Sequence, residues 1–181
     1  MTWRKITVYY SLSLVLGIYY FLFEWRPDAD KPMRGPRAVQ QSRFLPIARD
    51  DVHELVLQLQ GATIHARKAS QNWEILEPAG VNVTSALFES LIDLLTSDKE
   101  VQIVDQSTKD FAPYGLAQPH AVIQIIGANK NTTTTVYVGD RNPTESAVYA
   151  RKEDSPQVVL LGYSVRYYGD LIFESAGLAK K

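Results

Sequence analysis

The feature that most constrains this chain is an apolar run at residues 6–23, ITVYYSLSLVLGIYYFLF, which contains no charged residue and no proline. With a rise of about 1.5 Å per residue, a helix of this length nearly crosses the hydrocarbon core of a bilayer. Aromatic residues lie towards both ends, as at membrane–water interfaces: Trp3, Tyr9, Tyr10, Tyr19, Tyr20 and Trp25. We therefore predict a transmembrane anchor at residues 6–23, after a short tail at residues 1–5.

Two other interpretations of this run agree less well with its residues. A cleaved signal peptide needs small residues at its cleavage site, and the following segment FEWRPD contains none. A buried helix of a soluble protein has a polar face, which Ser11, Ser13 and Gly17 do not form. Ser13 and Gly17 instead have the small-xxx-small spacing that allows close packing between membrane helices.

The charges on either side of the run leave its orientation open. Arg4 and Lys5 precede it, whereas a larger number of basic residues follows, from Arg26 to Arg43. A count of Lys and Arg therefore places the C-terminal side in the cytoplasm. A basic tail before an apolar segment is nevertheless the layout of a signal anchor, and long domains translocate regardless of charge.

The remaining sequence separates into a linker and one domain. Residues 24–43 contain three prolines, a glycine and mixed charges without an apolar period, which is typical of a linker. As a flexible coil, its ends would lie on the order of 25 Å apart. Residues 44–176 are enough for one compact domain, followed by a tail at residues 177–181. The formal net charge of −1 and the mixing of charges indicate no nucleic-acid surface.

The first half of the domain, about residues 44–109, has the pattern of an antiparallel sheet with one helix. Thr84 or Ser85 is a suitable helix N-cap, and leucines at helical spacing follow. Alternating apolar residues and short β-branched runs predict strands at residues 52–60, 63–68, 72–76 and 101–104.

The second half, about residues 117–176, has the same order of strands followed by a helix. The final helix begins near Ser164 and contains Gly169, which predicts a shortened or kinked helix. The strands are expected at residues 121–126, 132–138, 147–151 and 158–161. We therefore predict an α+β fold: a transmembrane helix, then two repeated halves, each an antiparallel β-sheet with one packed helix.

Between the halves, residues 110–119 read DFAPYGLAQP. Pro113 and Gly115 favour a turn, and the apolar side chains of Phe111, Tyr114 and Leu116 would hold that turn against the core.

This turn and two other segments resemble a bacterial family known as domain of unknown function 4340, over about residues 44–173. In that family, W-x-[IL]-x-x-P precedes the first helix, YGL-x-x-P begins the second half, and VG[DN] followed by YAR marks later strands. The residues of this chain that match are Trp73, Pro78, Tyr114, Gly115, Leu116, Pro119, Gly139, Asp140, Tyr149 and Arg151.

The resemblance implies a location and a role. Family members typically have one N-terminal membrane helix and a domain on the outer face of the cytoplasmic membrane. This implies a cytoplasmic N-terminus and a periplasmic domain. Many members look like partners of ABC-type transport systems related to gliding-motility proteins, and no enzymatic activity is attached to the family. We therefore expect a non-catalytic accessory or structural subunit, without a cofactor, whose partners are the lipid bilayer and integral membrane subunits.

Two alternatives to this role stay open. The chain could be a scaffold subunit of a respiratory or photosynthetic complex. It could also be a periplasmic module that binds peptide or glycan between the halves, with the strand at residues 132–138 as a free edge for an extended peptide.

Few residues suggest chemistry. His53, His65 and His120 lack the spacing of a metal site, and His65 should point away from the buried face of its strand. Asp110 and Asp140 could form an acid–base pair, but Asp140 is better explained by hydrogen bonds within its own turn. We therefore predict no catalytic and no metal-binding residue.

The final helix carries more aromatic residues than one buried face requires. Core filling is the commoner role for such residues. The alternative is a docking face for a membrane partner, because tyrosine is enriched at interfaces; its residues would be Tyr163, Tyr167, Tyr168 and Phe173.

Overall fold

The computed structural model describes residues 14, 16, 19, 44–45, 47–70, 72–97, 101–128 and 132–179. The chain divides into two compact units, Met1–Gln40 and Gln41–Lys181, and the second unit is called the domain below. The predicted anchor and linker lie outside the described residues, except for Leu14, Leu16 and Tyr19, which are helical and exposed. No helix within the described residues is both long enough and apolar enough to cross a membrane.

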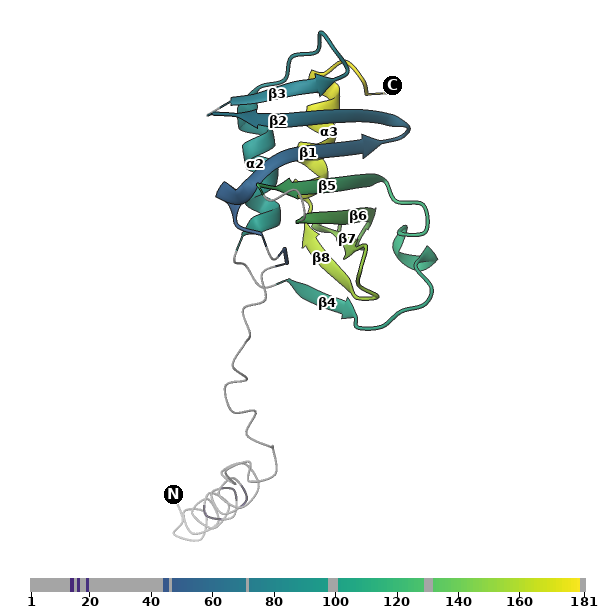
Figure 1. The fold of residues 1–181 in the computed structure, drawn as a ribbon. Coiled ribbons are helices and arrows are strands. Elements are labelled where there is room, and N and C mark those ends of the chain that lie inside the picture. Colours follow the sequence, from purple (N-terminus) through teal and green to yellow (C-terminus); the bar gives the residue numbers. More distant parts are fainter. Residues whose placement is uncertain are drawn as a thin grey trace, which may run out of the picture. The chain divides into compact units, whose positions relative to one another are not determined.

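The described part of the domain contains an eight-stranded sheet and two α-helices (Figure 1). Two short 3₁₀ turns, η1 (Arg49–Asp51) and η2 (Ala112–Tyr114), complete the regular structure. In chain order the strands and helices are β1 (Val52–Leu59), β2 (Ala62–Ala69), β3 (Asn72–Glu77), α2 (Ser85–Thr96), β4 (Gln102–Asp105), β5 (Ala121–Gly127), β6 (Thr133–Arg141), β7 (Ala147–Lys152), β8 (Val158–Gly162) and α3 (Ser164–Ser175). The α+β prediction is confirmed, and each half has strands followed by a helix.

The two halves share one sheet rather than forming two. Its strand order is β3-β2-β1-β5-β6-β7-β8-β4, with every pair antiparallel (Figure 1). The halves join where β1 pairs with β5, with Leu55 opposite Ile125. β4 belongs to the first half in sequence but pairs with β8 of the second, with Ile103 opposite Val159. The prediction of a separate sheet in each half is therefore wrong.

The prediction that residues 132–138 form a free edge is also wrong. β6 pairs with β5 through Val136 and Ile123 and with β7 through Tyr137 and Arg151, so both of its edges are occupied. The edges of the sheet are β3 and β4.

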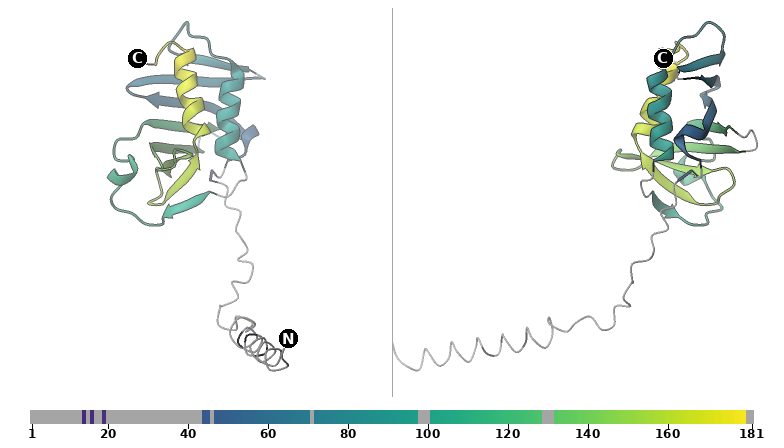
Figure 2. Two further views of the ribbon diagram at one scale, coloured as in Figure 1. Left: turned by 180° about the vertical axis from the view of Figure 1, so that it is seen from behind. Right: turned by 60° about the vertical axis from the view of Figure 1, so that its left-hand side comes forward.

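Both helices pack on the same face of the sheet, side by side (Figure 2). The alternation of β1 determines which face this is, because Leu55, Leu57 and Leu59 are buried while Gln58 is exposed. α2 presents buried Phe88 and Leu91 to this core. Its buried stripe is centred on Phe88 and Ile92, and Leu87 and Leu94 beside them are half-buried.

α3 begins at Ser164 as predicted and buries Val165, Ile172 and Phe173. It continues through Gly169, so the predicted shortening at this glycine is wrong. The helix ends before Gly177, whose φ of +70° is left-handed. The amide of Leu178 donates a hydrogen bond to the carbonyl of Phe173 at 2.9 Å, which closes the C-terminus of the helix.

Candidate functional site

The turn between the halves folds on itself as its residues predict. Pro113 is the second residue of the 3₁₀ turn, and Gly115 ends it at a left-handed φ of 67°. The amide of Leu116 donates to the carbonyl of Phe111 at 3.1 Å. Leu116 is buried next to Gly139 of β6, apart from the main core cluster, while Phe111 and Tyr114 are half-buried.

This turn lies directly against β6, and two glycines permit the contact. A Cβ atom on Gly139 would collide with the carbonyl oxygen of Tyr114, and a Cβ atom on Gly115 would collide with the carboxylate of Asp140. The side chain of Asp140 therefore faces Gly115 in the turn between the halves, rather than the turn that follows Asp140. The hydrogen bonds expected from Asp140 are made by Asn142, whose Oδ1 accepts from the amide of Ala147 at 3.1 Å.

Side chains from three motif segments then stack on one another. Tyr114 contacts Tyr149 edge to face, with ring centroids 5.1 Å apart. The guanidinium of Arg151 lies between two rings, 4.4 Å from the centroid of Phe111 and 4.3 Å from that of Tyr137. We call Phe111, Tyr114, Tyr137, Tyr149 and Arg151 the motif cluster. Its strand residues alternate with buried neighbours, so the cluster lies on the face of the sheet opposite the helices.

Two tyrosine hydroxyl groups of the cluster, those of Tyr114 and Tyr137, donate hydrogen bonds to carboxylates. Tyr114 donates to Asp105 at 3.4 Å, and Tyr137 donates to Glu153 at 3.2 Å. Burial, followed by the adjacent carboxylate, raises the pKa of each phenol above its usual value of 10.0. Both phenols are therefore neutral at neutral pH and contribute packing and hydrogen bonds rather than an activated oxygen.

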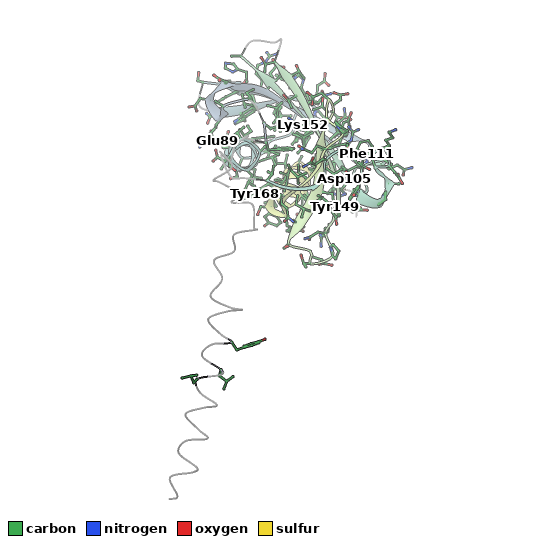
Figure 3. All side chains as sticks on the ribbon, turned by 90° about the horizontal axis from the view of Figure 1, so that it is seen from below. Glu89, Asp105, Phe111, Tyr149, Lys152 and Tyr168 are labelled. Atoms are coloured by element: carbon green, nitrogen blue, oxygen red, sulfur yellow. The ribbon has the colours of Figure 1, made fainter. Side chains whose placement is uncertain are left out.

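In Figure 3 the labels of Phe111 and Tyr149 lie on the opposite side of the view from Glu89 of α2. Three further motif residues lie elsewhere in the fold. Trp73 of β3 stacks on Phe88 of α2 with centroids 5.7 Å apart, and Pro78 follows β3. Pro119 follows the turn and precedes β5. The structure thus brings the YGL turn together with the VGD and YAR strands. Trp73 of the first motif packs against α2 instead.

A polar cluster occupies another part of the helix-free face. The carboxylate of Glu54 binds His65 Nε2 and Arg67 Nε, each at 3.0 Å. The hydrogen bond with His65 lowers the pKa of Glu54, burial opposes this shift, and Arg67 lowers the pKa further. The prediction that His65 points away from Ile64 is confirmed, because Ile64 is buried in the core.

His120 has a partner that the sequence did not indicate. Its Nε2 atom lies 2.8 Å from Asp170 Oδ1 of α3, and Arg166 lies 3.8 Å from the other oxygen. This pair lines a cavity of about 570 Å³ together with Leu59 and Glu174. No group of three or more His, Cys, Asp or Glu residues in the described part of the chain could hold a metal ion.

A second cavity, also of about 570 Å³, lies among α2, α3 and β8. Phe44, Leu94, Val101, Leu160 and Tyr168 provide most of its apolar lining. No residue of the motif cluster lines either of these two cavities.

The predicted docking face is mostly occupied within the domain. Phe173 is only 2 % exposed because it faces the core, so its assignment to a docking surface is wrong. Tyr163 accepts a hydrogen bond from Arg141 at 2.9 Å, and Tyr168 packs partly against the core. Tyr167 is 51 % exposed and meets the ring of Tyr168 at 5.5 Å.

Most of the predicted anchor residues lie outside the described residues. They are Trp3, Tyr9, Tyr10, Ser13, Gly17, Tyr20 and Trp25. Tyr19 is described, and it is helical and exposed.

The fold and the motif cluster together define an α+β domain with one antiparallel sheet, two helices on one face and a packed turn on the other. The family model described as "Domain of unknown function (DUF4340)" matches residues 38–168. The chain belongs to this family. No curated protein and no solved structure matches it.

Proposed function

We propose that this protein is a non-catalytic accessory subunit of a larger bacterial inner-membrane complex, and that this complex is an ABC-type transport assembly. In this proposal, residues 6–23 are a single-pass anchor, the N-terminus is cytoplasmic and the domain is periplasmic. The anchor provides localisation and contacts within the membrane. The domain provides a surface for the extracytoplasmic parts of the complex.

The observation that carries the proposal is that the motif residues pack against other residues of the domain. Tyr114, Gly115, Gly139, Tyr149 and Arg151 contact one another or close neighbours rather than line either large cavity. These residues therefore maintain the shape of a surface instead of presenting reactive groups to a substrate. Such a use of motif residues supports a structural or interacting role, since function depends on the site rather than on the fold.

Two features of the sequence support the membrane part of the proposal. The uncharged run at residues 6–23 has the length and the flanking aromatic residues of an anchor. The association with ABC-type transport is proposed because many members of this family look like partners of such transport systems.

Purification through the anchor tests the proposal. A C-terminally tagged chain would be extracted from its native membrane in mild detergent, alongside an unrelated tagged single-pass protein at the same level. We expect a polytopic membrane protein and an ATP-hydrolysing subunit to copurify with this chain alone, in a fixed ratio. Recovery of the chain by itself at full yield would contradict the proposal. Haem or pigment absorption in the purified complex would instead assign the chain to a respiratory or photosynthetic assembly.

A further inference from the structure

We propose that the outer edge of β4 binds an extended segment of a partner protein, apolar in its centre and basic at its ends, which joins the sheet as an additional strand. The inference deepens the accessory role proposed above and rests on it, because it specifies the surface through which the domain contacts its complex.

The first argument is that β4 is a sheet edge with exposed apolar side chains. Among the described strands it is the last one of the sheet, and it pairs with β8 on one side. Ile103 is 44 % exposed and Val104 is 40 % exposed. An edge strand presents backbone N–H and C=O groups to any extended chain, and strand addition uses these groups for affinity.

The opposite edge of the same sheet is protected differently. β3 carries Glu74 and Glu77, both exposed, around Leu76, which is 37 % exposed. Charged residues on an edge discourage pairing with another strand. β4 has no charged residue before Asp105, so of the two edges it is better suited to accept a strand.

The second argument is a cavity that reaches Val101, the residue before the start of β4. Val101 directly precedes β4, and Leu160 pairs with Gln102 of β4; both line the cavity among α2, α3 and β8. Leu94 and Tyr168 add further apolar lining. In strand addition, a pocket next to the edge receives side chains of the bound segment and provides specificity. Here it would receive an apolar side chain.

Charge indicates the ends of the bound segment. Arg49 binds both Glu89, at 3.1 Å, and Asp93, at 2.9 Å, and Asp93 lines the cavity. Among the described residues, this group of three therefore carries one more carboxylate than guanidinium. At the end of β4, Asp105 accepts hydrogen bonds from the neutral donors Ser107 N–H and Tyr114 O–H. Lysine or arginine near the ends of a segment would complement these charges, whereas a second copy of the chain would bring the same carboxylates.

A defined peptide tests this site on the full-length chain in detergent micelles. The probe is a fluorescent peptide with the centre Val-Thr-Val-Thr-Val and two lysines at each end; its counterpart has two glutamates at each end. We expect fluorescence anisotropy to show binding of the lysine-flanked peptide and at least about tenfold weaker binding of the other.

The variants separate the edge from the rest of the surface. The double substitution Ile103→Asn and Val104→Asn removes the apolar edge without changing charge, and we expect it to weaken peptide binding about tenfold. Leu76→Asn on β3 is the matched control and should leave binding unchanged. Equal binding of both peptides, or undiminished binding by the double variant, would overturn the proposal. Dimerisation abolished by the double variant, without peptide binding, would assign the edge to a second copy and also overturn it.

Copurification of the double variant distinguishes this inference from the function on which it rests. If wild type copurifies with a membrane complex but binds no peptide, and the double variant retains the complex, the β4 site is wrong and the accessory role stands. If the chain is always recovered alone yet the lysine-flanked peptide binds at β4, the accessory role is wrong and the binding site stands.

Discussion

Gly139 and Gly115 are the residues at which the turn and β6 come closest. Neither position has room for a side chain, because the carbonyl of Tyr114 and the carboxylate of Asp140 occupy the space. The requirement at Gly139 is steric, since this glycine does not have a positive φ, whereas Gly115 also has a left-handed φ of 67°. These two motif glycines are therefore explained by the close approach of the turn backbone to the backbone of β6.

We expect Gly139→Ala to destabilise the domain by about 1–3 kcal/mol, because the added methyl group must displace backbone atoms of the turn. Gly162→Ala in β8 is the matched control. A Cβ atom at Gly162 meets nothing within 4 Å, so its effect should stay within about 0.5 kcal/mol. Urea unfolding of the two variants and wild type, followed by circular dichroism, measures the difference. Equal stability of all three proteins would contradict the close approach.

Glu54 should make stability depend on acidic pH. Its pKa is lowered in the folded state, first by the hydrogen bond with His65 and then by Arg67, so the unfolded chain binds the proton more readily. The resulting stabilisation is present above the ordinary pKa of 4.5 and is lost as pH falls through the lowered folded pKa. We expect Glu54→Gln to flatten the fall in melting temperature below about pH 4.5. Glu74→Gln on β3 is the control; the same flattening in both variants would contradict this role of Glu54.

At the scale of the element, local patterns in the sequence were reliable guides. The alternation of β1 and the spacing of apolar residues in α2 reflect which side chains face the core, and that preference acts within each element. The placement of β4 was not predictable in this way. The sequence of its four residues does not show whether β4 pairs with β3 or with β8. The backbone N–H and C=O groups of β4 can form hydrogen bonds with either strand.

Gly169 within α3 and Gly177 just after it should respond in opposite directions to alanine. Gly169 lies within the helix with nothing within 4 Å of its Cβ position, so Gly169→Ala should stabilise the protein by about 0.5–1 kcal/mol. Gly177 has a φ of +70° after the helix end, so Gly177→Ala should destabilise it by about 1 kcal/mol. Thermal unfolding of each variant provides the measurement. A loss of stability at position 169 would show that the helix needs this glycine for packing.

At the scale of the whole molecule, the proposal depends on residues 6–23 staying in the membrane. We expect the chain to resist alkaline extraction of membranes and its domain to be digested by protease added to spheroplasts. An arginine at the centre of a membrane helix costs roughly 2.5–3.5 kcal/mol. The double substitution Leu14→Arg and Leu16→Arg should therefore move much of the chain to the soluble fraction, while Leu14→Ala with Leu16→Ala should not. A domain protected from protease until the membrane is permeabilised would reverse the proposed orientation.

The sequence by itself determined the fold class, the strands and helices, the buried face of most elements and the membership of the family. These features follow from short-range periodicity and from motifs read in order along the chain. Only the tertiary structure decided that β1 joins β5, that β4 lies beside β8, that His120 meets Asp170 and that Arg151 lies between Phe111 and Tyr137. Such contacts join residues far apart in sequence, and the packing of the whole sheet selects them, so no local pattern records which partner each residue finds.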